Sequence, residues 1–175
     1  MKRIPNLLYL SVAVFFIWAC ASQPLPPAQS EPATKAIRLQ LKSDPQLNYF
    51  NNLPHSLLVC VYQLSNLNEL NQLADDTEGI YKLRECALFD SSVTQAKRLI
   101  VHPDQDLNLE LDRAQGTKYV AIVAGYQLLE KERVIRMFEI PEIIEKKGWI
   151  RRTKTLKLAP LDISLRLGPQ QIESI

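Results

Sequence analysis

Few side chains in this sequence are suited to covalent or metal chemistry, and their spacing restricts what they can do. His55 and His102 each stand next to a proline, and no H-x-x-H, C-x-x-C or closely spaced carboxylate group accompanies them, so we expect no metal site. Ser56 or Ser91 could be paired on paper with a histidine, but no G-x-S-x-G elbow activates either serine. The five glycines form no phosphate-cradling loop. We therefore expect no catalytic residues, no cofactor and no enzymatic activity.

The residues around Cys20 indicate a covalent modification of this cysteine more clearly than those around any other residue. Two basic residues near the start precede an apolar segment, residues 7–17, which is too short for a permanent membrane-spanning helix. The segment ends in Ile-Trp-Ala-Cys, which resembles the bacterial lipobox except that Trp18 replaces a small residue. We expect residues 1–19 to be a signal peptide and Cys20 to be lipidated. A plain signal peptide and an uncleaved anchor are the alternatives, and each places the folded part outside the cytoplasm.

Residues 21–35 follow as a linker that contains four prolines and almost no apolar periodicity. Together with the lipidated cysteine, this tether covers residues 20–35, and we expect a folded domain over 36–175. No aspartate follows Cys20, so by resemblance to enterobacterial sorting signals the anchor is expected in the outer membrane.

Charge and length limit the function classes that remain. Of 175 residues, removal of the first 19 leaves 156, which is enough for one core. The same removal lowers the basic residues from 21 to 19, equal to the 19 acidic ones. A neutral mature chain gives no argument for nucleic-acid binding, which needs clustered positive charge.

Cys60 and Cys86 remain after Cys20 is assigned to lipid. In an oxidising compartment the two are a disulfide candidate. The alternative is two separate buried thiols, because free cysteine is among the most buried residue types.

Alternating and continuous apolar patterns predict a mainly β domain. The chain from 56 to 64 is almost continuously apolar, as expected for a central strand, and helical spacing predicts two short helices, 67–74 and 78–86. Further strands complete a set of about eight: 36–41, 96–101, 107–111, 118–129, 133–140, 153–158 and 162–167. Short strands at this spacing predict a two-sheet antiparallel β-sandwich with a helical insertion after the second strand.

One basic cluster surrounds a predicted hairpin at Gly148-Trp149. It comprises Lys146, Lys147, Arg151, Arg152, Lys154 and Lys157. Two interpretations stay open: a face that meets phospholipid headgroups or an acidic partner, and a solvated hairpin whose lysines protect a sheet edge.

Several segments in this order resemble a known family. VCVYQLSNLNELNQL, CALFD, LDRAQGTKYVAIVAGYQL and RVIRMFEIP, behind a lipobox, resemble the type VI secretion outer-membrane lipoproteins (TssJ, also called SciN). The resemblance implies a transthyretin-like sandwich that faces the periplasm from the outer membrane. It also implies a structural adaptor that binds the periplasmic C-terminal region of the inner-membrane protein TssM.

The resemblance also implies that partner contacts come from the loop between the first two strands, here residues 44–55, DPQLNYFNNLPH. Aromatic and apolar residues between asparagines suit a binding hot spot. The candidates are Leu47, Asn48, Tyr49, Phe50, Asn51, Asn52 and Leu53. Alternatively, Tyr49 and Phe50 fold back and plug the end of the sandwich.

Two other functions compete with the adaptor. One is a periplasmic β-sandwich lipoprotein that binds a small apolar ligand or lipid, which would need a deep apolar cavity between the sheets. The other is an inhibitor or chaperone lipoprotein unrelated to secretion.

Overall fold

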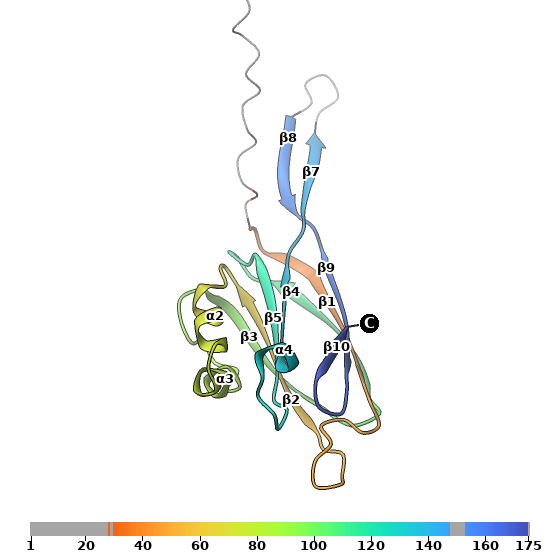
Figure 1. Cartoon of the computed structure of the whole chain (residues 1–175). Helices are drawn as coiled ribbons and strands as arrows, with labels where there is room; N and C mark the ends of the chain where they lie inside the picture. Colours follow the sequence, from red (N-terminus) through yellow and green to blue (C-terminus); the bar gives the residue numbers. More distant parts are fainter. Residues whose placement is uncertain (1–27, 29, 148–152, 175) are drawn as a thin grey trace, which may run out of the picture.

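The structure, a computed structural model, describes residues 28, 30–147 and 153–174 (Figure 1). The predicted signal peptide and Cys20 lie outside the described residues. Ten strands and three short helices make up this part of the chain. The strands are β1 (Ala33–Ser43), β2 (Leu57–Leu64), β3 (Val93–Val101), β4 (Asp106–Arg113), β5 (Tyr119–Ala124), β6 (Ile135–Glu139), β7 (Glu142–Lys147), β8 (Thr153–Leu158), β9 (Leu161–Leu167) and β10 (Ile172–Ser174). The helices are α2 (Asn68–Ala74), α3 (Thr77–Leu83) and α4 (Lys131–Val134).

Two four-stranded sheets form the predicted sandwich. Their strand orders are β10-β9-β1-β4 and β3-β2-β5-β6, and a separate two-stranded sheet pairs β7 with β8. The alternation of buried and exposed residues shows which face of a strand packs into the core. In β9 the odd-numbered residues are buried and the even-numbered ones are exposed. The mainly β fold with a helical insertion after β2 is thus as predicted.

The central strand β2 is apolar along its length because both of its faces are covered. Val59 and Val61 belong to the core shared by the sheets, whereas Cys60 and Tyr62 point to the opposite face, where they contact the chain at the end of α3. Figure 1 shows α2 and α3 on the outside of the sheet that contains β2 and β3. The prediction of a central strand buried on both faces is confirmed.

Several details differ from the sequence prediction. β1 and β9 pair in parallel, so the first sheet is mixed rather than purely antiparallel. β5 ends at Ala124 instead of residue 129, because the chain turns at Gly125 and inserts Tyr126 into the core. β1 starts three residues earlier than predicted, where an irregularity between Ala33 and Ile37 hides the alternation. The strand expected over 133–140 is shorter, because α4 takes up residues 131–134 and β6 begins at Ile135. The three-residue β10 was not predicted, whereas β7 and β8 pair as the hairpin expected around 148–149.

Candidate functional site

Three loops meet at one end of the sandwich, which we call the loop end. They are the β1–β2 loop (44–56), the β5–α4 segment (125–130) and the β9–β10 turn (168–171). The parallel pairing of β1 and β9 brings the ends of these two strands together, and β5 runs the same way because it is antiparallel to β2. Figure 1 shows the loop end at the bottom of the molecule, opposite the β7–β8 hairpin and the start of β1.

The first part of the β1–β2 loop is fixed to the sandwich. One carboxylate oxygen of Asp44 accepts a hydrogen bond from Arg166 at 2.6 Å, and the other accepts from the backbone N–H of Gln46 at 2.8 Å. The hydrogen bond from Arg166 holds the pKa of the Asp44 carboxyl below its usual value. Leu47 then enters the core and is fully buried, and the amide nitrogen of Asn48 donates to the Ser56 carbonyl at 3.2 Å.

The second part of the loop is a small hairpin, which we call the loop tip (Phe50 to Leu53). The backbones of Phe50 and Leu53 exchange two hydrogen bonds of 3.1 Å. Asn51 and Asn52 between them have φ angles of 50° and 61°, the left-handed pair that a type I′ hairpin turn requires. The Phe50 ring stacks on His55 with centroids 3.7 Å apart, while 60% of Leu53 is exposed. The tip therefore has a defined backbone and presents an apolar side chain to solvent.

A hollow of about 240 Å³ lies beside the tip and is lined by all three loops. Its lining residues are Asn48, Tyr49, Phe50, Tyr126, Gln127, Leu128, Pro169 and Gln170. The backbone N–H of Tyr49 donates to the Pro169 carbonyl at 2.8 Å, and the hydroxyl of buried Tyr126 donates to the Gln171 carbonyl at 2.9 Å. Burial raises the pKa of the Tyr126 hydroxyl, so it stays a neutral donor. Leu128 on the rim is 47% exposed.

The structure divides the seven predicted contact residues. Leu47 and Asn48 are buried, and Asn48 also lines the hollow; whether the seven residues contact a partner stays a prediction. Asn51, Asn52 and Leu53 are exposed, and Tyr49 and Phe50 are half-buried. Leu47, rather than the two aromatic residues, closes the end of the sandwich.

Sequence reasoning missed the contributions of the other two loops. Tyr126 and Leu128 were assigned to a long strand because their segment is apolar, and the β9–β10 turn was not considered. Gly125 was the available signal, since a glycine inside an apolar run often marks the point where a strand ends.

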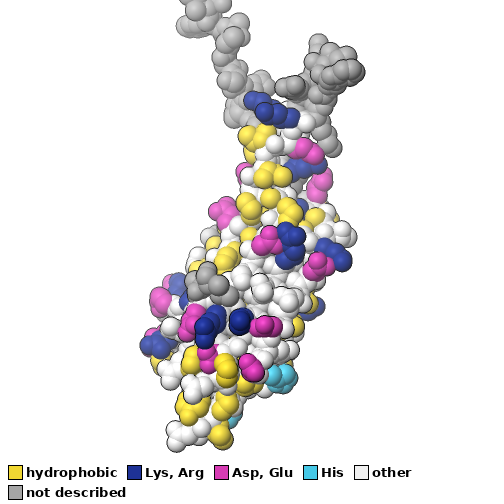
Figure 2. Space-filling view, turned by 90° about the vertical axis from the view of Figure 1, so that its right-hand side faces the viewer, with side chains coloured by type: hydrophobic (Ala, Val, Ile, Leu, Met, Phe, Trp, Pro, Cys, Tyr) yellow, Lys and Arg dark blue, Asp and Glu magenta, His cyan; other side chains and the backbone are white. Residues whose placement is uncertain are grey.

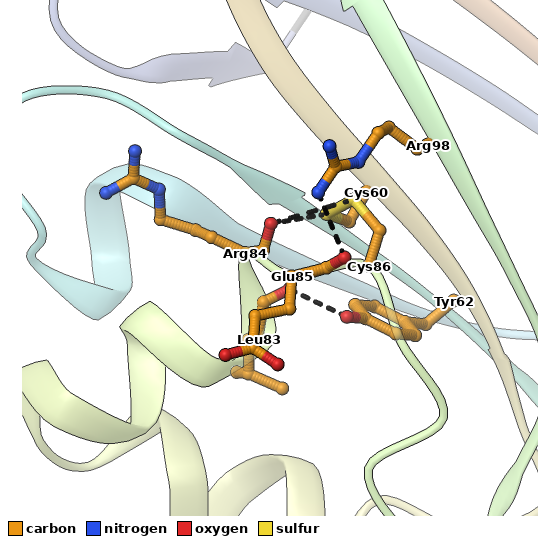
Figure 3. Close-up of a disulfide and its surroundings, with 7 residues drawn as sticks. All are labelled: Cys60, Tyr62, Leu83, Arg84, Glu85, Cys86 and Arg98. Atoms are coloured by element: carbon orange, nitrogen blue, oxygen red, sulfur yellow. Dashed lines mark hydrogen bonds between the residues drawn. A yellow bond between two sulfur atoms is a disulfide. The ribbon is translucent and has the colours of Figure 1, made fainter.

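Cys60 and Cys86 form a disulfide in the structure, with Cα atoms 5.1 Å apart (Figure 3). The bridge joins β2 to the chain that follows α3. Two hydrogen bonds support the same junction: the Tyr62 hydroxyl donates to the Leu83 carbonyl at 2.7 Å, and Arg98 donates to the Glu85 carbonyl at 3.1 Å. Burial raises the pKa of Tyr62 to about 12. The disulfide thus fixes the helical insertion onto the outer face of its sheet.

One pair with catalytic side chains does come together. The Ser56 hydroxyl and Nδ1 of His102 are 2.8 Å apart, but both residues are exposed. A nucleophile–base system also needs a group that orients the base, and within the described ranges nothing bonds to the other ring nitrogen of His102. In that same part of the chain, no cluster of three or more potential metal ligands occurs.

The positions of the hollows bear on the alternative of a ligand-binding lipoprotein. A second hollow, of about 700 Å³, lies over the outer face of the first sheet among exposed polar side chains such as Arg38, Gln40 and Asn108. Neither this hollow nor the one at the loop end lies between the sheets, where a carrier of apolar ligands would bind its ligand.

Across residues 28, 30–147 and 153–174, no helix has the length and apolar character needed to cross a membrane.

Fold and loop end define a class of protein: a two-sheet β-sandwich with a loop-built surface at one end. Residues 35–160 match the family profile described as type VI secretion lipoprotein (VasD, EvfM, TssJ), and the chain belongs to this family. Membership associates the protein with the type VI secretion system and with the cell envelope.

Solved structures share the fold. Lip of Serratia marcescens, described as a membrane-bound component of the type VI secretion system, has 18% identity and a TM-score of 0.60, covering 79% of this chain and 96% of its own. The lipoprotein TssJ1 of Pseudomonas aeruginosa has 16% identity and a TM-score of 0.55, covering 85% and 95%. A structure described as the TssM C-terminal domain from EAEC has 10% identity and a TM-score of 0.57, covering 79% and 96%. No curated protein matches the sequence.

Proposed function

We propose that this chain is an outer-membrane lipoprotein that faces the periplasm and acts as a structural adaptor, not an enzyme, in the type VI secretion membrane complex. Its partner is the periplasmic C-terminal region of a TssM-like inner-membrane protein. The lipid is attached at Cys20, and residues 1–19 are removed as a signal peptide.

The observation that carries this proposal is the separation of the two ends of the sandwich. The chain that leads back to Cys20 leaves at the start of β1, whereas the loop tip follows the end of β1. Eleven residues at about 3.3 Å each place these ends roughly 35 Å apart. A lipid anchor at one end therefore directs the loop end away from the outer membrane, toward a partner that rises from the inner membrane.

The loop end also has the composition and rigidity of a protein-binding surface. This surface exposes two large apolar side chains, Leu53 and Leu128, and the ring of Phe50 is half-buried there. The backbone bonds within the tip and from Tyr49 to Pro169 hold these side chains in place before binding, which lowers the entropic cost of association. Figure 2 shows hydrophobic side chains gathered at this end of the molecule.

Isothermal titration against the periplasmic fragment of a TssM-like protein tests the proposal. Phe50→Ala combined with Leu53→Ala should weaken binding by at least about 2 kcal/mol, the threshold for a hot spot. Leu88→Ala combined with Met137→Ala is the matched control, because these side chains are 66% and 37% exposed and belong to none of the three loops; Met137 pairs with Ala121 in the middle of β5. Equal affinity of the two variants, both with wild-type melting curves, would remove the tip from the binding site.

A further inference from the structure

The β7–β8 hairpin projects from the sandwich and pairs with neither large sheet (Figure 1). An isolated two-stranded ribbon is at best marginally stable in water, so packing against a further surface would stabilise this arm. Ile143 and Ile144 are 50% and 55% exposed, one on each face of the ribbon, because successive residues of a strand point to opposite sides.

The register of the hairpin brings two lysines together on one face, which we call the lysine face (Ile144, Lys146, Lys154 and Leu156). Lys146 lies directly opposite Lys154, and Ile144 lies directly opposite Leu156. Both lysines are exposed, and neither has an ion-pair partner among the residues that the structure describes. Like charges in directly opposed positions destabilise a strand pair. An anionic surface bound against this face would relieve that repulsion.

The other face of the hairpin carries an ion pair. There Lys157 forms an ion pair of 2.8 Å with Glu145. On the lysine face the acidic residue is Glu142, which lies opposite Leu158 at the base of the hairpin, four residues from Lys146. The distal part of the lysine face therefore combines two unneutralised cations with two apolar side chains.

A buried arginine places the arm beside the segment that leads to the anchor. Arg113 is 6% exposed, and its Nε donates to the Glu31 carbonyl at 3.3 Å. Its Nη1 donates to the carbonyls of Leu158 and Ala159 at 3.4 and 3.2 Å. One guanidinium thus holds both the chain just before β1 and the end of β8. Eleven residues separate Cys20 from Pro32, where β1 is about to begin, and when extended they reach at most about 40 Å.

From this geometry we propose that the lysine face binds the anionic phospholipid surface of the membrane that carries the lipid anchor. Lysines attract anionic headgroups, and adjacent apolar side chains insert at the headgroup boundary. The occupant is a membrane because the anchored chain and the arm leave the sandwich at the same end. The arm and the acyl group then fix the orientation of the loop end together, a step that rests on the proposed lipidation.

Vesicle flotation tests the proposal without the acyl group. The mature chain from residue 20, with Cys20→Ser, is mixed with vesicles of phosphatidylglycerol and phosphatidylcholine or of phosphatidylcholine alone. Binding should require phosphatidylglycerol and weaken with added salt. Lys146→Ala with Lys154→Ala should lower partitioning about thirtyfold, as expected for two lysines near a charged surface. The matched control, Lys82→Ala with Lys97→Ala, changes the net charge equally on α3 and β3 and should bind like the parent.

An environment-sensitive fluorophore on Ile144→Cys supplies a second readout that does not depend on the lysines. Its emission should shift to the blue with anionic vesicles, whereas the same probe on Leu88→Cys should not respond. Equal partitioning of the two lysine variants, or an unresponsive probe at position 144, would overturn the proposal. A response at position 144 to the TssM-like fragment without vesicles would also overturn it and assign the arm to a protein. None of these results depends on whether the loop end binds its partner.

Discussion

Reduction of the Cys60–Cys86 disulfide should destabilise the fold without affecting the loop end. The two cysteines are 26 residues apart in sequence, and the bridge closes a loop that contains α2 and α3. In the chain-entropy description, closing a loop of this length in the unfolded chain is worth about 3.5 kcal/mol. Reduction removes no heavy atom from the protein, so no cavity contributes to the difference, as it would if buried Cys60 were replaced by alanine.

The assay compares chemical denaturation of the oxidised and reduced mature protein, each checked by mass spectrometry. A disulfide lowers the mass by two hydrogens relative to two thiols. We expect the oxidised form to be more stable by about 3.5 kcal/mol, and the reduced form to retain affinity for the TssM-like fragment because the bridge lies outside the three loops. Two free thiols in the protein purified under oxidising conditions would refute the bridge. Equal stability of verified oxidised and reduced forms would refute the loop-closure reasoning.

Three further predictions address the loop end and the anchor. Leu47→Ala should cost about 2–5 kcal/mol of stability, as for other fully buried leucines, whereas Leu53→Ala at the exposed tip should change it by less than about 0.5 kcal/mol; equal melting shifts would contradict the assignment. The hydrogen bond from Arg166 lowers the folded pKa of Asp44, so its contribution is present above the unfolded pKa near 4 and lost as pH falls through the folded pKa. Asp44→Asn should flatten the loss of stability measured by denaturation below about pH 4, and an unchanged acid profile would count against this role. Cys20→Ser should leave the signal peptide uncleaved and remove the protein from outer-membrane fractions, and normal fractionation would contradict lipidation.

The sequence was sufficient to predict the layers of the fold, because alternation and burial reflect local physics. The continuous apolar run of β2 implied coverage on both faces, and the helices that provide this coverage were visible in their own spacing. The pairing of the strands could not be predicted in the same way. The parallel pairing of β1 with β9 joins segments more than 120 residues apart, and no local pattern in either strand encodes the direction of its neighbour.

The candidate site was only partly predictable for a similar reason. The β1–β2 loop could be singled out, but its apolar residues look alike in sequence, and burial alone distinguishes Leu47 from Leu53. The Asn51-Asn52 pair was an unused signal, since asparagine tolerates the left-handed backbone that the tip adopts. Tyr126 joins the site through a bond to the Gln171 carbonyl, a contact across 45 residues that depends on the assembled fold.

Site-specific photo-crosslinking in cells tests the central claim that the loop end meets the inner-membrane partner. A photoreactive amino acid replaces Leu53 in one strain and Leu88 in another, and both positions are well exposed, at 60% and 66%. We expect an adduct with the TssM-like protein from position 53 and none from position 88. An adduct from position 88 and none from position 53, in strains that produce equal amounts of the protein, would contradict it.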